Sequence, residues 1–199
     1  MSTGPIRADG TIEVKGQPYR VADLICDEAD TARYDGGQFA VVYLSPRDYH
    51  RVHAPVAGEI CVVRSVAGDY YPVNSIGEEY VPQLFARNRR VAIAIDTERI
   101  GRVTVLMVSA MIVGRITVSA VEGRDVPFGV HAVDPPLRVA RGDEIGIFRL
   151  GSTAVIFVEK GASLEWRRDP RPVVLGEPLH PCATGASGTP RIDEEARAG

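Results

Sequence analysis

Residues 145–158 most limit what this chain can fold into, because two apolar β-forming runs flank a short corner. Residues 145–148 precede the corner, residues 155–158 follow it, and Gly151 and Ser152 occupy it. Branched and aromatic residues separated by glycine and serine are typical of a strand, a tight turn and a second strand. The pattern predicts two strands that meet at Gly151-Ser152, in a mostly β fold.

The Gly151-Ser152 pair has two interpretations. Glycine can take backbone angles that are closed to other residues, and a hydroxyl beside a strained carbonyl can attack it. An ordinary Gly-Ser turn is the commoner structure. The pair alone therefore does not decide between a plain turn and an intramolecular cleavage site.

The rest of the chain continues the β pattern. Strands are predicted at 11–15, 19–21, 39–44, 91–95, 101–108 and 111–118, a helix of about two turns within 22–35, and a long loop at 122–138. Residues 54–73 have the strand-turn-strand cadence of a barrel-sandwich fold, and 141–148 and 173–179 repeat it weakly. We expect a mostly β, barrel-sandwich-like fold of short strands with one or two short helices. The domain covers 1–182, and 183–199 form a disordered tail.

Composition excludes several classes of protein. The 199 residues carry a net charge of −3 without a long basic run, so the chain has no signature of nucleic-acid binding. Cys26, Cys61 and Cys182 lack the spacing of a disulfide framework or a zinc site. The N-terminus has no signal-peptide core. The longest apolar run, 103–113, has about half the ~20 residues of a membrane-spanning helix and predicts a buried strand.

Two histidines in the run 43–53 are candidates for chemistry. His50 and His53 are three residues apart, and Ser45 and Pro46 suit the cap and first position of a short helical turn. On such a turn the two rings share a face. Their spacing fits structural residues, metal ligands or an acid/base pair. No third histidine or cysteine lies nearby, which disfavours a metal.

Four motifs together resemble the phosphatidylserine decarboxylases, which are made as proenzymes and cut themselves at Leu-Gly-Ser-Thr. The motifs are Ala8-Asp9-Gly10, the eleven residues 43–53 with Pro55 and Gly58, Leu84–Asn88, and Leu150-Gly151-Ser152-Thr153. The resemblance covers residues 6–179. It implies cleavage between Gly151 and Ser152, with the chains 1–151 and 152–199 remaining together as a heterodimer.

A decarboxylase acting on an amino group needs an electron sink. Pyridoxal phosphate would need a lysine beside a phosphate cradle, and the chain has only Lys15 and Lys160 and no glycine-rich phosphate loop. The resemblance implies instead a pyruvoyl group made from Ser152, with neither pyridoxal phosphate nor metal. In that reaction the Ser152 hydroxyl attacks the Gly151 carbonyl and the acyl group moves to oxygen. Elimination leaves dehydroalanine, which hydrolyses to ammonia and the pyruvoyl group.

The resemblance also implies roles for four side chains. Ser152 is the nucleophile, His53 its base and Asp9 the residue that orients the imidazole, since a serine hydroxyl needs a positioned base. His50 is a substrate-side residue or the proton donor in decarboxylation. Without the resemblance, Asp9 would be read as a turn aspartate.

Three functions remain open from the sequence. The first is conversion of phosphatidylserine to phosphatidylethanolamine and carbon dioxide; the second is the same chemistry on a soluble amino acid, modified serine or peptide. The third is a non-catalytic barrel-sandwich binding module.

The resemblance also bears on location. The resemblance suggests a homodimer. Bacterial members of the family usually carry a membrane-associating region ahead of the Asp-Gly motif, and the residues before Asp9 here have no such apolar segment. We expect a cytoplasmic protein that meets phosphatidylserine peripherally, at the inner face of the cell membrane. The candidate docking segment is 122–138, with Val126, Pro127, Phe128 and Val130.

Overall fold

The computed structural model describes residues 1–111, 114–149, 151–161 and 171–179. The predicted tail at 183–199, Cys182 and Leu150 lie outside the described residues. The strands are β1 (Ser2–Pro5), β2 (Thr11–Val14), β3 (Gln17–Arg20), β4 (Gln38–Tyr43), β5 (Arg51–His53), β6 (Gly58–Val66), β7 (Arg90–Thr97), β8 (Gly101–Val108), β9 (Ile116–Val118), β10 (Gly129–Val139), β11 (Glu144–Phe148) and β12 (Thr153–Val158). The helices are α1 (Val21–Ile25), α2 (Glu28–Thr31), α3 (Ser75–Tyr80) and α4 (Leu84–Arg87), with a 3-10 turn at Ala32–Tyr34. The mostly β prediction is confirmed, although short helices are more numerous than the expected one or two.

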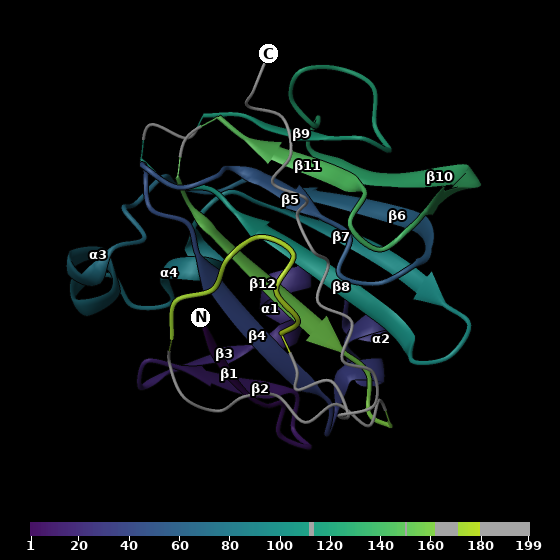
Figure 1. Ribbon diagram of the computed structural model, residues 1–199. Coiled ribbons are helices and arrows are strands. Elements are labelled where there is room, and N and C mark those ends of the chain that lie inside the picture. Colours follow the sequence, from purple (N-terminus) through teal and green to yellow (C-terminus); the bar gives the residue numbers. More distant parts are fainter. Residues whose placement is uncertain (112–113, 150, 162–170, 180–199) are drawn as a thin grey trace, which may run out of the picture.

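A seven-stranded antiparallel sheet forms the centre of the protein, in the order β1-β4-β12-β8-β7-β6-β10. A three-stranded sheet, β5-β11-β9, lies across its upper end in Figure 1, and the β2-β3 hairpin lies at the opposite end. Every residue of β12 is buried, and all but Thr153 are apolar, as in a strand that is covered on both faces. The second half of the predicted strand-corner-strand therefore occupies the middle of the larger sheet.

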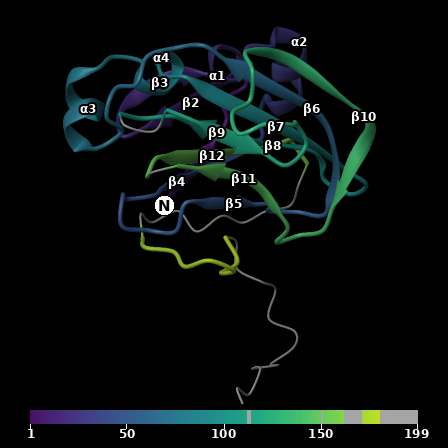
Figure 2. The same ribbon diagram turned by 90° about the horizontal axis from the view of Figure 1, so that it is seen from above.

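Helices α1, α2 and α4 lie on one side of this sheet (Figure 2). Leu24 and Ile25 of α1 and Leu84 and Phe85 of α4 join the main apolar core. The buried Arg90 guanidinium donates to carbonyl groups at the ends of both helices, at 2.8 Å to Leu24 and 2.6 Å to Ala86. Because the last carbonyls of a helix have no partner within it, Arg90 fixes two helix ends to one strand.

The histidine run 43–53 is not a helical turn. The Asp48 amide donates to the Ser45 carbonyl at 2.9 Å, and the Asp48 carboxylate accepts from the Ser45 amide at 2.8 Å. This closed turn leads directly into β5, which pairs with β11. The prediction that His50 and His53 share a helical face is wrong, because residues three apart along an extended chain point to opposite sides.

The loop predicted at 122–138 is also wrong over most of its length. Residues 129–139 form β10, which pairs with β6 at the edge of the larger sheet. Alternation of apolar residues is poor in this strand because most of its side chains are exposed. Val126 is buried, whereas Phe128 and Val130 of the expected docking segment are exposed. In the same way, of the strand predicted at 111–118, the described residues 111 and 114–118 form a strand only at Ile116–Val118.

Several chain segments converge where β12 begins, in the upper left of Figure 1. Thr153 pairs with Tyr43 at the end of β4 and with Val108 at the end of β8. Phe148 ends β11 three residues before Gly151. The sheet topology thus brings four strand ends to the predicted cleavage site. No helix among the described residues is long and apolar enough to cross a membrane.

Candidate active site

Ser152 lies fully buried at the start of β12. Its hydroxyl donates to the Val108 carbonyl, and its own carbonyl accepts from the Leu44 amide at 2.7 Å. Both neighbouring strands therefore hold the residue through its polar atoms. The hydroxyl that the sequence predicts as nucleophile is shielded from water and has a fixed direction.

Gly151 is packed tightly against the start of the histidine run. A Cβ built at Gly151 would lie 2.6 Å from both the Leu44 carbonyl oxygen and the Pro46 nitrogen. Gly151 is not among the described residues with a positive φ angle. Glycine is needed here for the close approach of two backbones, rather than for a left-handed conformation.

Replacement of Gly151 by alanine should therefore be severe. Backbone atoms of residues 44–46 stand where the new methyl group would lie, and a shift of either segment would strain the hydrogen bond from the Leu44 amide to the Ser152 carbonyl. We expect destabilisation by about 3 kcal/mol or more and loss of cleavage at this bond. Thermal unfolding and the cut fraction on a denaturing gel would measure both.

The matched control is Gly114→Ala, because a Cβ at Gly114 meets nothing within 4 Å and its φ is not positive. That variant should unfold at the wild-type temperature and be cut to the same extent. A Gly151→Ala protein with unchanged stability and cleavage would contradict the close packing described.

His50 lies on the loop that packs against Gly151. Its Nε2 is 2.9 Å from the Ser45 carbonyl oxygen, and its own carbonyl accepts from the Phe148 amide at 2.9 Å. Ser45 is one of the residues that contact Gly151. His50 is thus placed at the same end of β11 as the Gly151-Ser152 bond.

His53 lies at the other end of the same strand pair. It is opposite Glu144, four residues or about 13 Å along β11 from Phe148. Its Nδ1 is 2.7 Å from the Gly142 carbonyl oxygen and its Nε2 is 2.8 Å from the Tyr49 hydroxyl. Because a carbonyl only accepts hydrogen bonds, Nδ1 carries the proton of the neutral ring, and Nε2 keeps its lone pair. That tautomer is the one a general base acting through Nε2 requires.

Asp9 lies far from both histidines and Ser152. It is exposed in the turn before β2, where its carboxylate accepts from the Thr11 amide at 3.0 Å and hydroxyl at 2.6 Å. The Thr11 hydroxyl, above all, lowers the pKa of Asp9. Ile6 bonds to Gly37 at the start of β4, whereas Ser152 bonds at its other end, about 20 Å away at the usual rise of a strand.

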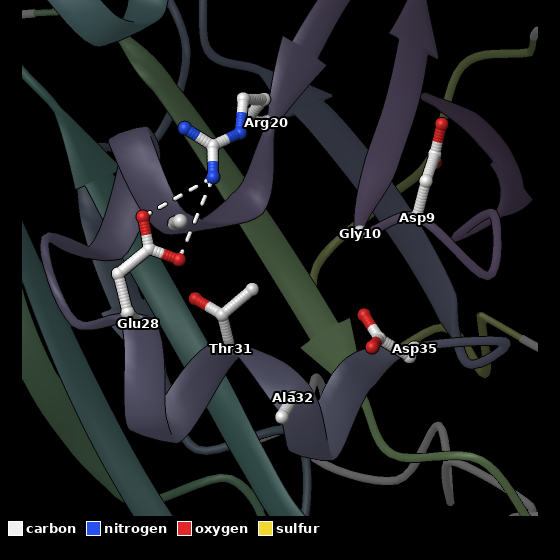
Figure 3. Close-up of a pocket in the computed structure, with 8 residues that line it drawn as sticks. Asp9, Gly10, Arg20, Glu28, Thr31, Ala32 and Asp35 are labelled. Carbon is white, nitrogen blue, oxygen red and sulfur yellow. Dashed lines mark hydrogen bonds and ion pairs between the residues drawn. The ribbon is translucent and has the colours of Figure 1, made fainter.

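A small hollow of about 150 Å³ adjoins Asp9. Figure 3 shows Arg20 and Glu28 joined across one side of it, with Asp9 and Asp35 on the other. Its lining includes charged side chains of both signs, and its volume is about half the lower end of the range that is typical of small-molecule sites. The hollow beside Asp9 is separate from the surroundings of Ser152.

The structure therefore brings Ser152, Gly151 and His50 into one region, with His53 further along β11 and Asp9 at the opposite end of β4. The described residues show no hydrogen bond that joins Asp9, His53 and Ser152 to one another. In this structure the Gly142 carbonyl, not Asp9, orients His53.

Asn88, the last residue of the motif Leu84–Asn88, connects several parts of the site. Its fully buried amide bonds to the backbone amide and carbonyl of Tyr71, at 2.9 and 2.8 Å, and donates to the Ser109 carbonyl at 2.9 Å. Ser109 follows Val108, which accepts from Ser152. Asn88 thereby fixes the end of β8 against which the Ser152 hydroxyl rests. A buried side-chain amide without hydrogen-bond partners would lower the stability of the fold. Once the burial of Asn88 is known, that rule indicates a structural role for it.

Tyr49 was also missed, although it lies within the histidine run. Its ring stacks on His53 with centroids 5.6 Å apart, and its hydroxyl bonds the same ring. The signal in the sequence was the position of Tyr49, four residues before His53. Among the described residues, no group of three or more histidine, cysteine or acidic side chains is arranged to hold a metal ion.

Fold and site together define a mostly antiparallel β protein that buries a Gly-Ser peptide bond among strand ends, with a histidine-bearing loop packed against it. The family model described as phosphatidylserine decarboxylase matches residues 1–179. Similar curated proteins, each named phosphatidylserine decarboxylase proenzyme, include those of Saccharophagus degradans (40% identical over 83% of this chain), Acinetobacter baumannii strain ATCC 17978 (42% over 87%) and Shewanella sediminis (38% over 88%).

This chain belongs to the phosphatidylserine decarboxylase family. The matched regions cover 59%, 62% and 65% of those three relatives. The chain thus spans about three-fifths of the length of the curated proteins it matches. The resemblance drawn from the four motifs is confirmed.

Proposed function

We propose that this protein is a self-processing, pyruvoyl-dependent decarboxylase that converts phosphatidylserine to phosphatidylethanolamine and carbon dioxide. The observation that carries the proposal is the buried Ser152 hydroxyl next to a Gly151 packed against residues 44–46. Membership of a family whose relatives are named as proenzymes supports it.

The residues around position 152 fit a pyruvoyl group. Ser152 provides its three carbon atoms, and only a residue without a Cβ fits on its N-terminal side. A pyruvoyl group supplies the electron sink that decarboxylation needs. Strand ends surround the buried Ser152, and the Val108 carbonyl holds the hydroxyl until a base accepts its proton.

The proposed roles of the titratable residues follow the family motifs. His53 is the base for cleavage, a role that requires the Tyr49 hydroxyl to turn away from Nε2 and the ring to reach Ser152 from its place further along β11. His50, on the loop that touches Gly151, serves the decarboxylation step. Asp9 as the orienting residue remains a proposal that requires the 1–10 segment to reach His53 from its present place at the far end of β4.

Cleavage would leave the two chains associated. Strand β12, which starts one residue after the cut, pairs along its whole length with β4 and β8. Both partners belong to the 1–151 chain, and all six residues of β12 are buried. We infer a stable heterodimer of the two fragments.

Docking at a lipid surface, on the cytoplasmic face of the membrane, is the proposed way to reach the substrate. Large apolar side chains that are exposed on this protein include Met111, Phe128 and Val130, at 56, 59 and 69%. Exposed apolar side chains at a rim are typical of surfaces that meet membranes or partners. Phe128 also lies under the Arg89 guanidinium, 5.0 Å from its centroid.

The deciding assay measures carbon dioxide release from phosphatidylserine vesicles and, in parallel, from serine, tryptophan and serine-containing peptides. We expect turnover with the vesicles and none with the free amino acids. Turnover confined to a soluble amino acid or peptide would replace the lipid assignment and leave the pyruvoyl chemistry standing. An intact 21.5 kDa chain without any turnover would instead indicate a binding module.

A further inference from the structure

Three arginines line an open hollow at the end of β11, the strand that ends three residues before Gly151. The hollow measures about 650 Å³ and is lined by Gly114, Arg115, Arg124 and Arg149. Arg149 lies only three residues before Ser152. This volume falls in the range of small-molecule sites, whereas the hollow beside Asp9 is a quarter as large.

Strand pairing brings these arginines together from separate parts of the sequence. Ile116 of β9 is opposite Phe148 of β11, so Arg115 and Arg149 extend the two neighbouring strands side by side. The Thr117 hydroxyl donates to the Arg124 carbonyl at 2.8 Å, which brings the third arginine back to β9. The sequence has no basic run that would predict this cluster.

A buried arginine fastens the base of the hollow. The Arg89 guanidinium, 2% exposed, donates to the Gly114 carbonyl at 3.0 Å and to the Asp125 carboxylate at 2.7 and 3.0 Å. It also donates to the Val126 carbonyl at 3.0 Å. The two ends of the segment that carries Arg115 and Arg124 are therefore tied to one rigid group, and a rigid base holds a binding site in place.

The three lining guanidinium groups are free to bind an anion. Among the residues that the structure describes, none of the three donates to a carboxylate or forms an ion pair. The Asp125 carboxylate attracts Arg115 without a direct contact, and its oxygens accept hydrogen bonds from Arg89 and from the Ile116 amide, the latter at 3.0 Å. Like charges on neighbouring strands destabilise a sheet, and a bound phosphate would remove that repulsion through paired N–H donors.

We propose that Arg115, Arg124 and Arg149 bind the phosphodiester of a serine glycerophospholipid while its serine group reaches position 152. This inference rests on the proposed function and names the part of the substrate that the protein grips. Exposed Met111 and Phe128 lie on the same connecting segments, where acyl chains that continue from the phosphate would meet apolar surface. The arginines act by binding and orienting the substrate, apart from the reaction at Ser152.

The first test is kinetic and uses the purified, cut wild-type protein with Arg115→Gln, Arg124→Gln, Arg149→Gln and the triple variant. The substrate is dicaproyl phosphatidylserine, kept below the concentration at which it forms micelles. Each single change should raise KM about tenfold, the effect of one charge-assisted hydrogen bond, with kcat within twofold and the cut fraction unchanged. Inorganic phosphate should inhibit the wild type competitively and the triple variant hardly at all.

Arg99→Gln is the matched control, since Arg99 is exposed like the three lining arginines. It lies in the turn before Gly101, where β8 begins, whereas Val108 is at the other end of that strand. It should leave KM unchanged. Wild-type KM values in all three arginine variants would overturn the proposal, as would a fall in the cut fraction with no change in KM.

The second test does not depend on turnover. Isothermal titration measures the binding of glycerophosphoserine to each variant, with serine as the probe that lacks phosphate. Loss of glycerophosphoserine binding in the arginine variants supports the site even if the wild-type protein releases no carbon dioxide, an outcome that would defeat the proposed function alone. Equal binding by wild type and triple variant overturns the site whatever the activity.

Discussion

Ser152→Ala should yield a single uncut chain of 21.5 kDa, where the wild-type protein gives two fragments split between Gly151 and Ser152. The reason is that the hydroxyl at position 152 is both the attacking group and the source of the pyruvoyl carbons. Decarboxylation should fall to background, because without Ser152 the protein cannot form the pyruvoyl group that serves as the electron sink. Intact mass and carbon dioxide release measure the two effects.

Folding should survive this change. The side chain of Ser152 makes one hydrogen bond to a backbone carbonyl, a loss of about 1 kcal/mol, and β12 stays paired on both sides. Ser65→Ala is the matched control, because its buried hydroxyl also donates to a carbonyl, that of Val126 at 3.3 Å. Ser65→Ala should be cut normally. Fragments from the Ser152→Ala protein, or a free serine at the start of the wild-type small fragment, would disprove the processing proposal.

The second large effect is expected from the histidines. His53→Ala should block cleavage, since the family motif assigns the base to His53 and its Nε2 carries the lone pair that a base needs. His50→Ala should leave cleavage largely intact and lower decarboxylation by about 10²- to 10⁴-fold, the usual contribution of a positioned acid or base. A time course of cleavage, followed by turnover of the cut fraction, separates the two steps.

His131→Ala provides the control, because its ring also bonds a backbone carbonyl, that of Pro127 at 2.8 Å, on an exposed strand. It should be cut and active. The structure makes the opposite outcome informative, because His50 lies nearer than His53 to Gly151. If His50→Ala stops cleavage and His53→Ala does not, the two roles must be exchanged.

The mostly β fold could be predicted from the sequence because its signals are local. The strand predicted at 101–108 is a strand that is buried from Val103 to Val108, and the apolar run 155–158 lies within the buried strand β12. The errors arose where tertiary contacts override local preference. Ser45 and Pro46 suit the start of a helix, yet the pairing of the following residues with β11 extends the chain. The glycines and prolines of residues 122–138 resemble a loop, yet pairing with β6 makes 129–139 an edge strand.

The four family motifs, and Ser152 as the nucleophile, could be identified from the sequence alone. A run such as Leu150–Thr153 can be recognised without knowing which residues surround it in space. Only the tertiary structure shows why Gly151 must be glycine, what holds His53, and where Asp9 lies relative to both. It also brings Arg149 together with Arg115 and Arg124, which lie on a separate segment of the chain. Distances across a folded chain depend on strand order and register, and a linear pattern of residues does not contain them.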